Sequence, residues 1–163
     1  MIVYCPEDFL KELQRGEYPA TGPACAKAVL MIEPANFTVC MESAADNSYM
    51  NLADTADPQR ALEQSRGLGE LISNQGIEVV RFPGDPGTPD AIFPNNVFAT
   101  SSNRFIIGHM RHPGRQKEAE REDIRAYFRA RAYEEIDLSR RDCIAELTGT
   151  LIIDSARRIA FCG

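Results

Sequence analysis

The 163-residue sequence contains no tryptophan, only two histidines, no CxxC pair and no long apolar run. Its apolar runs fall far short of the ~20 residues that an α-helix needs to span a bilayer, so no membrane partner is expected. Positive charge is also scarce, because 18 Lys and Arg stand against 24 Asp and Glu and give a net charge of −6. A nucleic-acid partner is therefore not expected either. The first residues show neither a basic flank nor a small-residue cleavage site, which indicates no signal peptide.

The composition is that of a globular protein. Apolar residues make up 44% and charged residues 26% of the chain, close to globular averages. The length suits one domain over 1–163 with a sizeable core. The cysteines are odd in number and scattered, which is typical of reduced thiols in the cytoplasm rather than of a disulfide framework. They are Cys5, Cys25, Cys40, Cys143 and Cys162.

The clearest helix signal begins at Asp57-Pro58, a capping carboxylate followed by a proline at the first helical position. Gly76 is expected to end this helix, since glycine tolerates a positive φ. A strand over 77–82 and a strand–turn–strand hairpin over 97–109 follow. Between the helix ends, apolar residues at helical spacing predict the buried face: Ala61, Leu62, Leu68, Leu71 and Ile72.

The same order begins again further along the chain. Residues 115–131 predict a charged amphipathic helix, 133–138 a strand and 150–162 a second hairpin. The predicted buried stripe of that helix is Ile124, Tyr127 and Phe128. An offset of about 54 residues superimposes the strands of the two hairpins.

A helix followed by three strands, repeated at a fixed period, is typical of radial or linear arrays. The first part of the chain fits as a looser copy, with a capped helix over 6–15, a strand over 28–33 and a long polar loop over 34–56. An ordinary α+β sandwich with coincidental spacing is the alternative. The prediction is an α/β chain of about three αβββ units: 1–56, 57–110 and 111–163.

Two amides stand where strand propensity would not place them. Asn95 and Asn96 come directly before a buried strand, and Asp90 precedes them in the segment DAIFPNN. Such side chains at the mouth of a strand can bind a polar ligand. They are equally common in turns, where asparagine bonds to its own backbone. Both interpretations stay open from the sequence.

Glu146 occupies the corresponding place before the hairpin of the next unit. A carboxylate there can pair with a cationic group, and a guanidinium suits a planar bidentate partner. The alternative is a solvated surface glutamate. In a radial array, Asn96 and Glu146 would converge on the axis.

Other chemically active side chains give weaker signals. His109 and His112 precede Pro-Gly and are expected in a loop without a third metal ligand, so no metal site is predicted. Cys162 follows the apolar pattern of the last strand and is interpreted as a structural thiol. The stretch 114–125 is interpreted as a charged, solvated helix face.

Several segments in this order resemble the N-terminal half of the guanidino-group-modifying superfamily, which includes arginine deiminases, dimethylarginine dimethylaminohydrolases and amidinotransferases. They are EPANF (33–37), a polar segment ending near Asn51, DAIFPNN (90–96) and AELTGTLIIDSARRIAF (145–161). The citrulline-utilisation-type hydrolases are the most similar branch, through their FPNNW and LEGTG blocks.

The resemblance implies a pentein-like fold, a pseudo-fivefold α/β propeller with its site on the axis, of which this chain would form an incomplete part. It also implies a mechanism in which a Cys thiolate attacks the guanidinium carbon and forms a covalent thiouronium. A His acts as general acid and base, and carboxylates hold the guanidinium. No cofactor is implied.

Carried over by position, Glu146 matches the glutamate of the LEGTG block, which binds substrate or orients the His. Asn96 matches a substrate-binding position, with Asn95 and Phe93 as pocket neighbours. Asp90 is the further substrate-binding candidate. The sequence departs from the family pattern at Leu147, where the family has Gly, and at Val97, where it has Trp.

The family's catalytic His and Cys lie downstream of the LEGTG block, whereas His109 and His112 lie upstream of Glu146. We therefore expect this polypeptide to hold part of a guanidino site without its nucleophile. The expected partners are a small guanidino substrate and either the missing C-terminal part or a second copy. A non-catalytic binding or assembly module derived from the family is the alternative, and an independent small hydrolase using the two histidines is the third hypothesis.

Overall fold

The computed structural model describes residues 5–15, 26–53, 55–101, 103–154, 157 and 159–162. Its α-helices are α1 (Pro6–Arg15), α2 (Met41–Asp46), α3 (Pro58–Asn74), α4 (Pro113–Gln116), α5 (Glu122–Arg129) and α6 (Leu147–Thr150). Short 3₁₀ helices are η1 (Pro89–Ile92), η2 (Pro94–Asn96) and η3 (Lys117–Glu120). The strands are β1 (Ala28–Ile32), β2 (Glu78–Phe82), β3 (Phe98–Ser101), β4 (Arg104–Ile107), β5 (Glu134–Asp137), β6 (Leu151–Asp154) and β7 (Ile159–Cys162).

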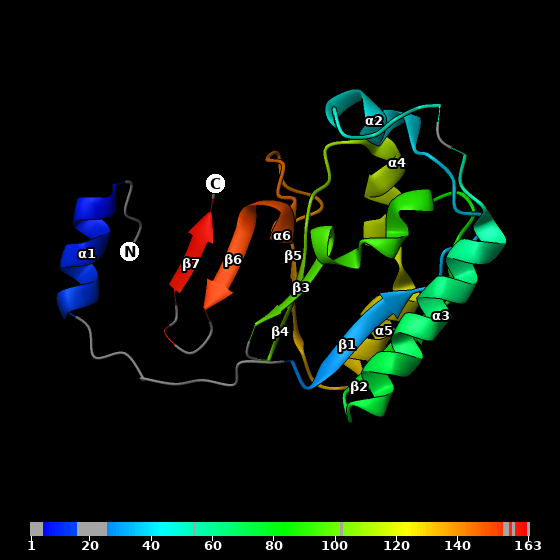
Figure 1. Ribbon diagram of the computed structural model, residues 1–163. Coiled ribbons are helices and arrows are strands. Elements are labelled where there is room, and N and C mark those ends of the chain that lie inside the picture. The colour runs from blue at the N-terminus through cyan, green and yellow to red at the C-terminus, as the bar shows by residue number, and fades with distance from the viewer. Residues whose placement is uncertain are drawn as a thin grey trace.

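Within the described residues the strands form three small sheets (Figure 1). β1 and β2 are parallel, and α3 belongs to the crossover between them. β3 and β4 form an antiparallel hairpin, and β5 joins β4 in parallel after the crossover through α5. β6 and β7 form the second hairpin. Parallel neighbours need such a helical crossover, so the chain builds an α/β fold from small sheets.

Both predicted hairpins are confirmed, as β3–β4 and β6–β7. Not all strands pair within the predicted αβββ units, however. β2 pairs with β1 rather than with the hairpin that follows it, and β5 pairs with β4 across position 110. A strand that follows a helix lies parallel to the strand before that helix, which is the usual result of a βαβ connection. The unit boundaries at 56 and 110 stay a prediction.

The predicted start and end of α3 are confirmed. The Asp57 carboxylate accepts hydrogen bonds from the amides of Gln59 and Arg60 at 3.0 and 3.1 Å. These two amides belong to the first turn, where helix donors have no partner within the helix. Gly76 adopts a φ of +80° just beyond the helix, a conformation that glycine reaches without steric cost.

The predicted buried face of α3 is partly wrong, because Leu68 and Leu71 are exposed. The residue of α3 that is buried is Gly69. A Cβ at Gly69 would lie 2.3 Å from Nη2 of Arg81 in β2, and the same nitrogen donates to the Arg66 carbonyl at 3.0 Å. Gly69 and Arg81 therefore make the contact between α3 and β2. Leu68 and Leu71 do not take part in it.

The predicted helix over 115–131 is interrupted, which corrects the expectation of one continuous helix. It consists of α4, η3 and α5, and Arg121 between η3 and α5 has an extended conformation with ψ 92°. The Arg121 guanidinium bonds to the Asp123 carboxylate and to the Pro83 carbonyl. The predicted stripe on α5 is confirmed at Ile124 and Phe128, which are buried, whereas Tyr127 is half-buried.

The core lies between the β3–β4–β5 sheet and α5. Phe105 stacks on Phe98 and on Phe128, with ring centroids 5.4 and 4.1 Å apart. Tyr127 and Phe82 make an edge contact that joins α5 to β2. The other fully buried apolar side chains are Ile107, Met110, Ile124 and Val97. This cluster ties the first two sheets into one packed body.

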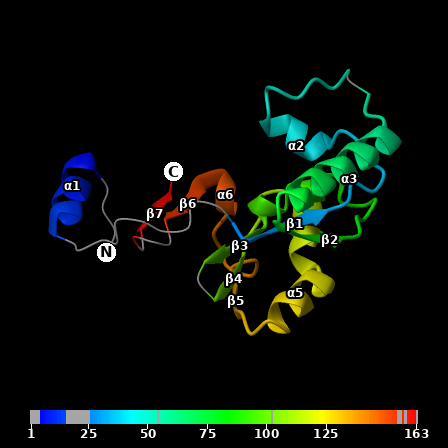
Figure 2. The same cartoon turned by 60° about the horizontal axis from the view of Figure 1, so that its bottom comes forward.

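Of the two N-terminal predictions, the loop is corrected and the helix is confirmed. The loop predicted over 34–56 contains α2, which lies above α4 in Figure 1. The helix over 6–15 is confirmed as α1, but it lies beside the C-terminal hairpin, where Phe9 meets Phe161 at 5.5 Å (Figure 2). Among the described helices, none is long and apolar enough to cross a bilayer.

Candidate functional site

The segment from Asp90 to Asn96 folds as two consecutive 3₁₀ turns that lead into β3. Each turn begins with a proline, Pro89 in η1 and Pro94 in η2. Proline fixes its own φ near the helical value and needs no donor partner at that position. The two turns bury Asp90, whose carboxylate accepts a hydrogen bond from the Ser43 hydroxyl of α2. The segment is thereby fixed to the start of the sheet and to α2.

A buried arginine holds the backbone of this segment. Nη2 of Arg115 donates to the carbonyls of Asp90 and Phe93, both at 3.3 Å, and Nη1 donates to Oδ1 of Asn96 at 3.2 Å. Nε and Nη2 donate to the two carboxylate oxygens of Glu118 at 3.1 and 3.0 Å. The predicted solvated face over 114–125 is therefore wrong at these two residues.

The burial of this ion pair has an electrostatic consequence. The Glu118 side chain is only 2% exposed. Burial raises the pKa of Glu118 above its ordinary value, and the hydrogen bond from Arg115 opposes the rise. A charged carboxylate is tolerated there because the Arg115 guanidinium donates one hydrogen bond to each of its oxygens.

The turn that carries Glu146 lies against the Asp90–Asn96 segment. Nδ2 of Asn95 donates to the Thr148 hydroxyl at 2.6 Å, and that hydroxyl donates to the Asn95 carbonyl at 2.7 Å. A Cβ at Gly149 would lie 3.2 Å from Nδ2 of Asn96. Both amides predicted from the sequence therefore face the α6 turn.

Gly108 lies where the end of β4 approaches both the Asp90–Asn96 segment and the turn that carries Glu146. A Cβ there would lie 2.4 Å from the Ala145 carbonyl oxygen and 3.2 Å from the Asn96 carbonyl oxygen. Beside it, His109 and Ala145 exchange backbone hydrogen bonds of 3.1 and 2.8 Å. The backbone leading to Glu146 is thus fixed to the end of β4.

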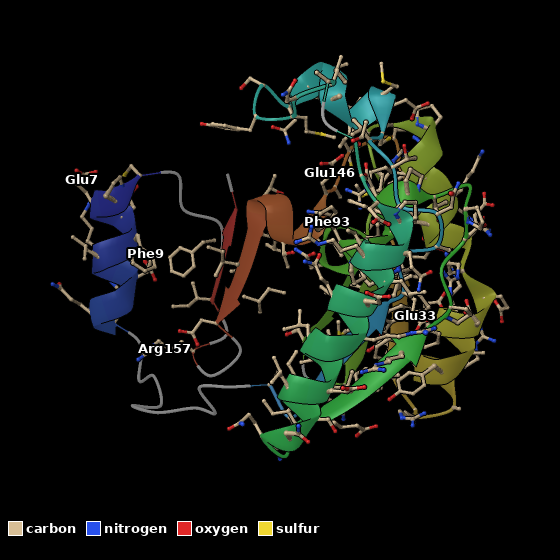
Figure 3. The ribbon with its side chains drawn as sticks, turned by 45° about the vertical axis from the view of Figure 1, so that its right-hand side comes forward. Glu7, Phe9, Glu33, Phe93, Glu146 and Arg157 are labelled. Atoms are coloured by element: carbon tan, nitrogen blue, oxygen red, sulfur yellow. The ribbon has the colours of Figure 1, made fainter. Side chains whose placement is uncertain are left out.

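Glu146 occupies the N-cap position of α6, without a hydrogen bond from its side chain to the helix, and is half-buried. One carboxylate oxygen accepts a hydrogen bond from the Arg111 amide at 3.1 Å. Figure 3 shows Glu146 and Phe93 beside α6. Glu146 lines a cavity of about 580 Å³. The other lining side chains include the polar or charged Ser43, Asp46, Arg111, His112 and Arg115 and the apolar Leu138, Ile144, Leu147 and Leu151.

Asp46 of α2 places a carboxylate between two basic side chains of this cavity. Oδ2 of Asp46 lies 2.8 Å from Nε2 of His112, and it accepts a hydrogen bond from Nη1 of Arg111 at 3.2 Å. The hydrogen bond from Arg111 lowers the pKa of Asp46, and His112 contributes in the same direction. The cavity therefore holds two carboxylates beside basic groups and a set of aliphatic side chains, a lining that suits a ligand with a charged group and an apolar part.

The structure places the predicted site residues at different depths around this cavity. Glu146 lines it directly. Asn96 and Asp90 do not line it, but they form hydrogen bonds with Arg115 and Ser43, which do. Asn95 lines a second cavity of about 490 Å³ beside β1 and β3. Phe93 is 49% exposed.

No thiol lines the cavity within the described part of the chain. Cys5, Cys40 and Cys143 are free thiols elsewhere. Cys25 and the side chain of Cys162 lie outside the described residues. Among the described side chains, no group of three His, Cys, Asp or Glu is arranged to hold a metal ion.

Sequence reasoning missed four residues of the site. Arg115 and Glu118 look like any solvated pair three residues apart on a helix, and Asp46 belongs to a segment without periodicity. Arg111 stands next to His112 in a stretch that the sequence marks only as a loop. Pro113-Gly114, which starts the short helix that carries Arg115, is the local signal that marks this region.

Residues 33–163 match the family model of N,N dimethylarginine dimethylhydrolase, eukaryotic. No curated protein sequence matches the chain. Among solved structures, ArgZ, an arginine dihydrolase from the ornithine–ammonia cycle in Cyanobacteria, is 23% identical with a TM-score of 0.67, over 82% of this chain and 20% of that chain. A variant of the N-terminal domain of ArgZ, covalently bound to a reaction intermediate, is 21% identical with a TM-score of 0.66, over 82% of this chain and 47% of that chain.

A variant of DDAH from Pseudomonas aeruginosa, complexed with citrulline, is 19% identical with a TM-score of 0.58, over 77% of this chain and 46% of that chain. These likenesses show the fold, that of part of a pentein-type α/β propeller. The chain spans about half the length of the single-domain structures that it matches and a fifth of the ArgZ chain.

Proposed function

This chain belongs to the N,N dimethylarginine dimethylhydrolase family, and we propose that it supplies the ligand-binding face of a hydrolase for arginine-like or citrulline-like substrates. The chemistry would use a Cys thiolate that attacks the guanidinium carbon and expels ammonia or an amine, which the His protonates, to form a covalent thiouronium. Water would then hydrolyse the thiouronium to a ureido product and release the thiolate. The nucleophile and the His would come from the C-terminal part of the same enzyme or from a partner copy, in the cytoplasm.

The meeting of the Asp90–Asn96 segment with the Glu146 turn carries this proposal. Two hydrogen bonds between Asn95 and Thr148 join the segments, which are far apart in the sequence. Segments that begin successive hairpins are expected to converge in a propeller. This convergence places Glu146 and Asn96 on adjoining turns.

Glu146 is the residue that we assign to the guanidinium. A guanidinium offers only N–H donors, and a half-buried carboxylate accepts them with a stronger hydrogen bond than a neutral group. The Asp46–His112 pair has the composition of an acid–base dyad, but no described thiol or serine hydroxyl is bonded to it.

The test is calorimetric titration of the 163-residue chain with L-arginine, Nω,Nω-dimethyl-L-arginine and L-citrulline, with L-norleucine as the negative ligand. We expect binding of at least one of the first three. Glu146→Gln should weaken it by roughly 10- to 150-fold, since a hydrogen bond to a charged group contributes about 1.5–3 kcal/mol. Glu134→Gln is the matched control, because Glu134 is exposed on β5 and pairs with Arg104.

Release of ammonia, dimethylamine and urea is measured in parallel. We expect no turnover by the chain alone. Clear turnover would show that the nucleophile lies within these residues. Binding that is equally strong in the Glu146 variant and its control would remove Glu146 from the site. Absence of binding by all three ligands would favour the alternative, an assembly module derived from the family.

A further inference from the structure

The hairpin β6–β7 repeats the register of the hairpin β3–β4. Ile152 lies opposite Phe161 in the second hairpin, and the residues 54 positions earlier lie opposite one another in the first. Side chains alternate between the two faces of a strand, and directly opposed residues share a face. One face of the first hairpin therefore carries Phe98, Phe105 and Ile107. The corresponding face of the second hairpin, which we call the Ile152–Phe161 face, carries Ile152, Ile159 and Phe161.

A helix covers this face on the first hairpin. Phe105 stacks on Phe128 of α5 with ring centroids 4.1 Å apart, and the three residues of the face are at most 7% exposed. On the second hairpin, Ile152 is 69% and Phe161 is 46% exposed. Apolar surface that α5 buries on the first hairpin is therefore accessible on the second.

The helix that contacts the Ile152–Phe161 face is α1, from the other end of the chain (Figure 3). The rings of Phe9 and Phe161 meet edge to face, with centroids 5.5 Å apart and planes inclined by 62°. α1 covers the face only in part, because Ile152 and Phe161 keep the exposure given above. α1 also precedes residue 33, where the match to the family begins. The helix on this face is therefore not an element that the family model describes.

We propose that the Ile152–Phe161 face is the docking surface for an amphipathic helix of the part that supplies the nucleophile, and that α1 blocks this surface in the isolated chain. In the first hairpin, the helix on the face leads into β5, which pairs in parallel with β4. Within the described residues β7 pairs only with β6, so its other edge is open to such a strand. The chain covers 47% and 46% of two single-domain structures that it matches, so more than half of such a domain remains to be supplied.

The docking surface adjoins the candidate site. β6 begins at Leu151, directly after α6, and Leu151 lines the Glu146 cavity. A part that docks on this hairpin therefore arrives beside Glu146. Two helices that need the same side chains exclude one another, so α1 must leave before the site can be completed. This inference rests on the proposed function for the incoming part, and its tests need no guanidino ligand.

The first experiment asks whether α1 occupies the face. In the ¹³C-labelled chain we expect a nuclear Overhauser effect between the ring protons of Phe9 and Phe161. Phe9→Asp should abolish it and raise the fluorescence of bis-ANS, a dye that binds exposed apolar surface. Phe9 is not part of the core cluster around Phe105, so this variant should keep the far-UV circular dichroism of wild type. If Phe9→Asp disturbs the hairpin itself, Phe9→Ala removes the ring without adding a charge, and the same changes are expected.

Leu10→Asp is the matched control. It places the same charge one residue further along α1, at a side chain that is 53% exposed. It should keep both the Phe9–Phe161 effect and the dye fluorescence of wild type. A mixture of labelled and unlabelled chains should show no effect between chains. An effect between chains would identify α1 of a second copy as the occupant and would overturn the block within one chain, as would absence of the effect in wild type.

The second experiment asks whether the face accepts a helix when α1 is absent from it. The probe is a synthetic peptide of residues 5–15, titrated into the ¹⁵N-labelled chain while the amide shifts of Ile152 and Phe161 are followed. An apparent Kd rises in inverse proportion to the fraction of molecules that are free to bind. If α1 covers the face in nine molecules of ten, the Kd for wild type and for Leu10→Asp should be about 10-fold higher than for Phe9→Asp.

The same peptide with Phe9→Asp should bind to none of the three proteins. Equal Kd values for wild type and Phe9→Asp would show that α1 blocks nothing. Failure of the peptide to shift Ile152 and Phe161 in the Phe9→Asp chain would show that the face is no docking surface for a helix. If the guanidino titrations fail while these results hold, the proposed function falls and the block by α1 stands.

Discussion

Adding one methyl group at Gly108 is expected to move the turn that carries Glu146 away from the Asp90–Asn96 segment and from the end of β4. The Cβ of Gly108→Ala would lie 2.4 Å from the Ala145 carbonyl oxygen, 3.1 Å from Cγ of Leu147 and 3.2 Å from the Asn96 carbonyl oxygen. Ordinary contact distances are roughly 1 Å longer than the shortest of these. The methyl therefore forces the backbone at Ala145 away from the end of β4, and Glu146 moves with it.

The magnitude follows from two contributions. Overpacking of this kind costs about 1–3 kcal/mol. The two backbone hydrogen bonds between His109 and Ala145 contribute about 1 kcal/mol each. Alanine offsets about 0.4–1 kcal/mol by restricting the unfolded chain. We expect Gly108→Ala to lower the free energy of unfolding by about 2–4 kcal/mol.

Urea denaturation followed by circular dichroism measures this change, and amide chemical shifts locate it. The shifts should be largest at Ala145, Glu146 and Leu147. Gly67→Ala is the control, since nothing lies within 4 Å of a Cβ there and the position is inside α3. That variant should gain about 0.5–1 kcal/mol. An unfolding free energy for Gly108→Ala within about 0.5 kcal/mol of wild type, with unchanged shifts at these residues, would refute the reasoning.

Three further outcomes are expected. Asp57→Ala should cost about 1 kcal/mol by removing the α3 cap, and Asp57→Asn, which keeps the acceptor, should restore most of it in urea titrations. Phe105→Ala should cost about 3–5 kcal/mol, whereas Leu71→Ala at an exposed position should change stability by under about 0.5 kcal/mol; equal losses would contradict the assigned core. Because the pKa of Glu118 is raised above 4.5 in the folded state, its contribution to stability is complete below pH 4.5 and declines as the pH rises through the folded-state pKa. Urea titrations should therefore show a larger advantage of wild type over Glu118→Gln at about pH 4 than at about pH 7, and the opposite trend would contradict burial as the dominant cause.

Local chemistry made part of the fold predictable from the sequence. The Asp57-Pro58 start and the Gly76 end depend on backbone groups a few residues away, so short sequence patterns suffice. The two hairpins need only an apolar strand, a polar turn and a second apolar strand. The family resemblance then supplied the propeller, which no local pattern specifies.

The partners of the strands and of the buried charges depend on distant parts of the chain. Nothing in the sequence of β2 says that it pairs with β1 rather than with β3. Arg115 and Glu118 have the spacing of an exposed helical ion pair, and only the Asp90–Asn96 segment lying over them makes them buried. Glu146 was found because its block is similar to a family motif, whereas Asp46 in α2 had neither periodicity nor motif.

α2 is attached to the rest of the molecule without a buried side chain of its own. Its contacts are polar: Glu42 accepts from the Gly114 amide, Ser43 donates to Asp90, and Asp46 pairs with Arg111 and His112. Exposed ion pairs contribute only about 0–1 kcal/mol each, and little apolar surface is uncovered when α2 departs. Opening of α2 therefore needs much less free energy than global unfolding, and its amide protons exchange with solvent ahead of those in the core. Each such opening removes Ser43 and Asp46 from the wall of the Glu146 cavity.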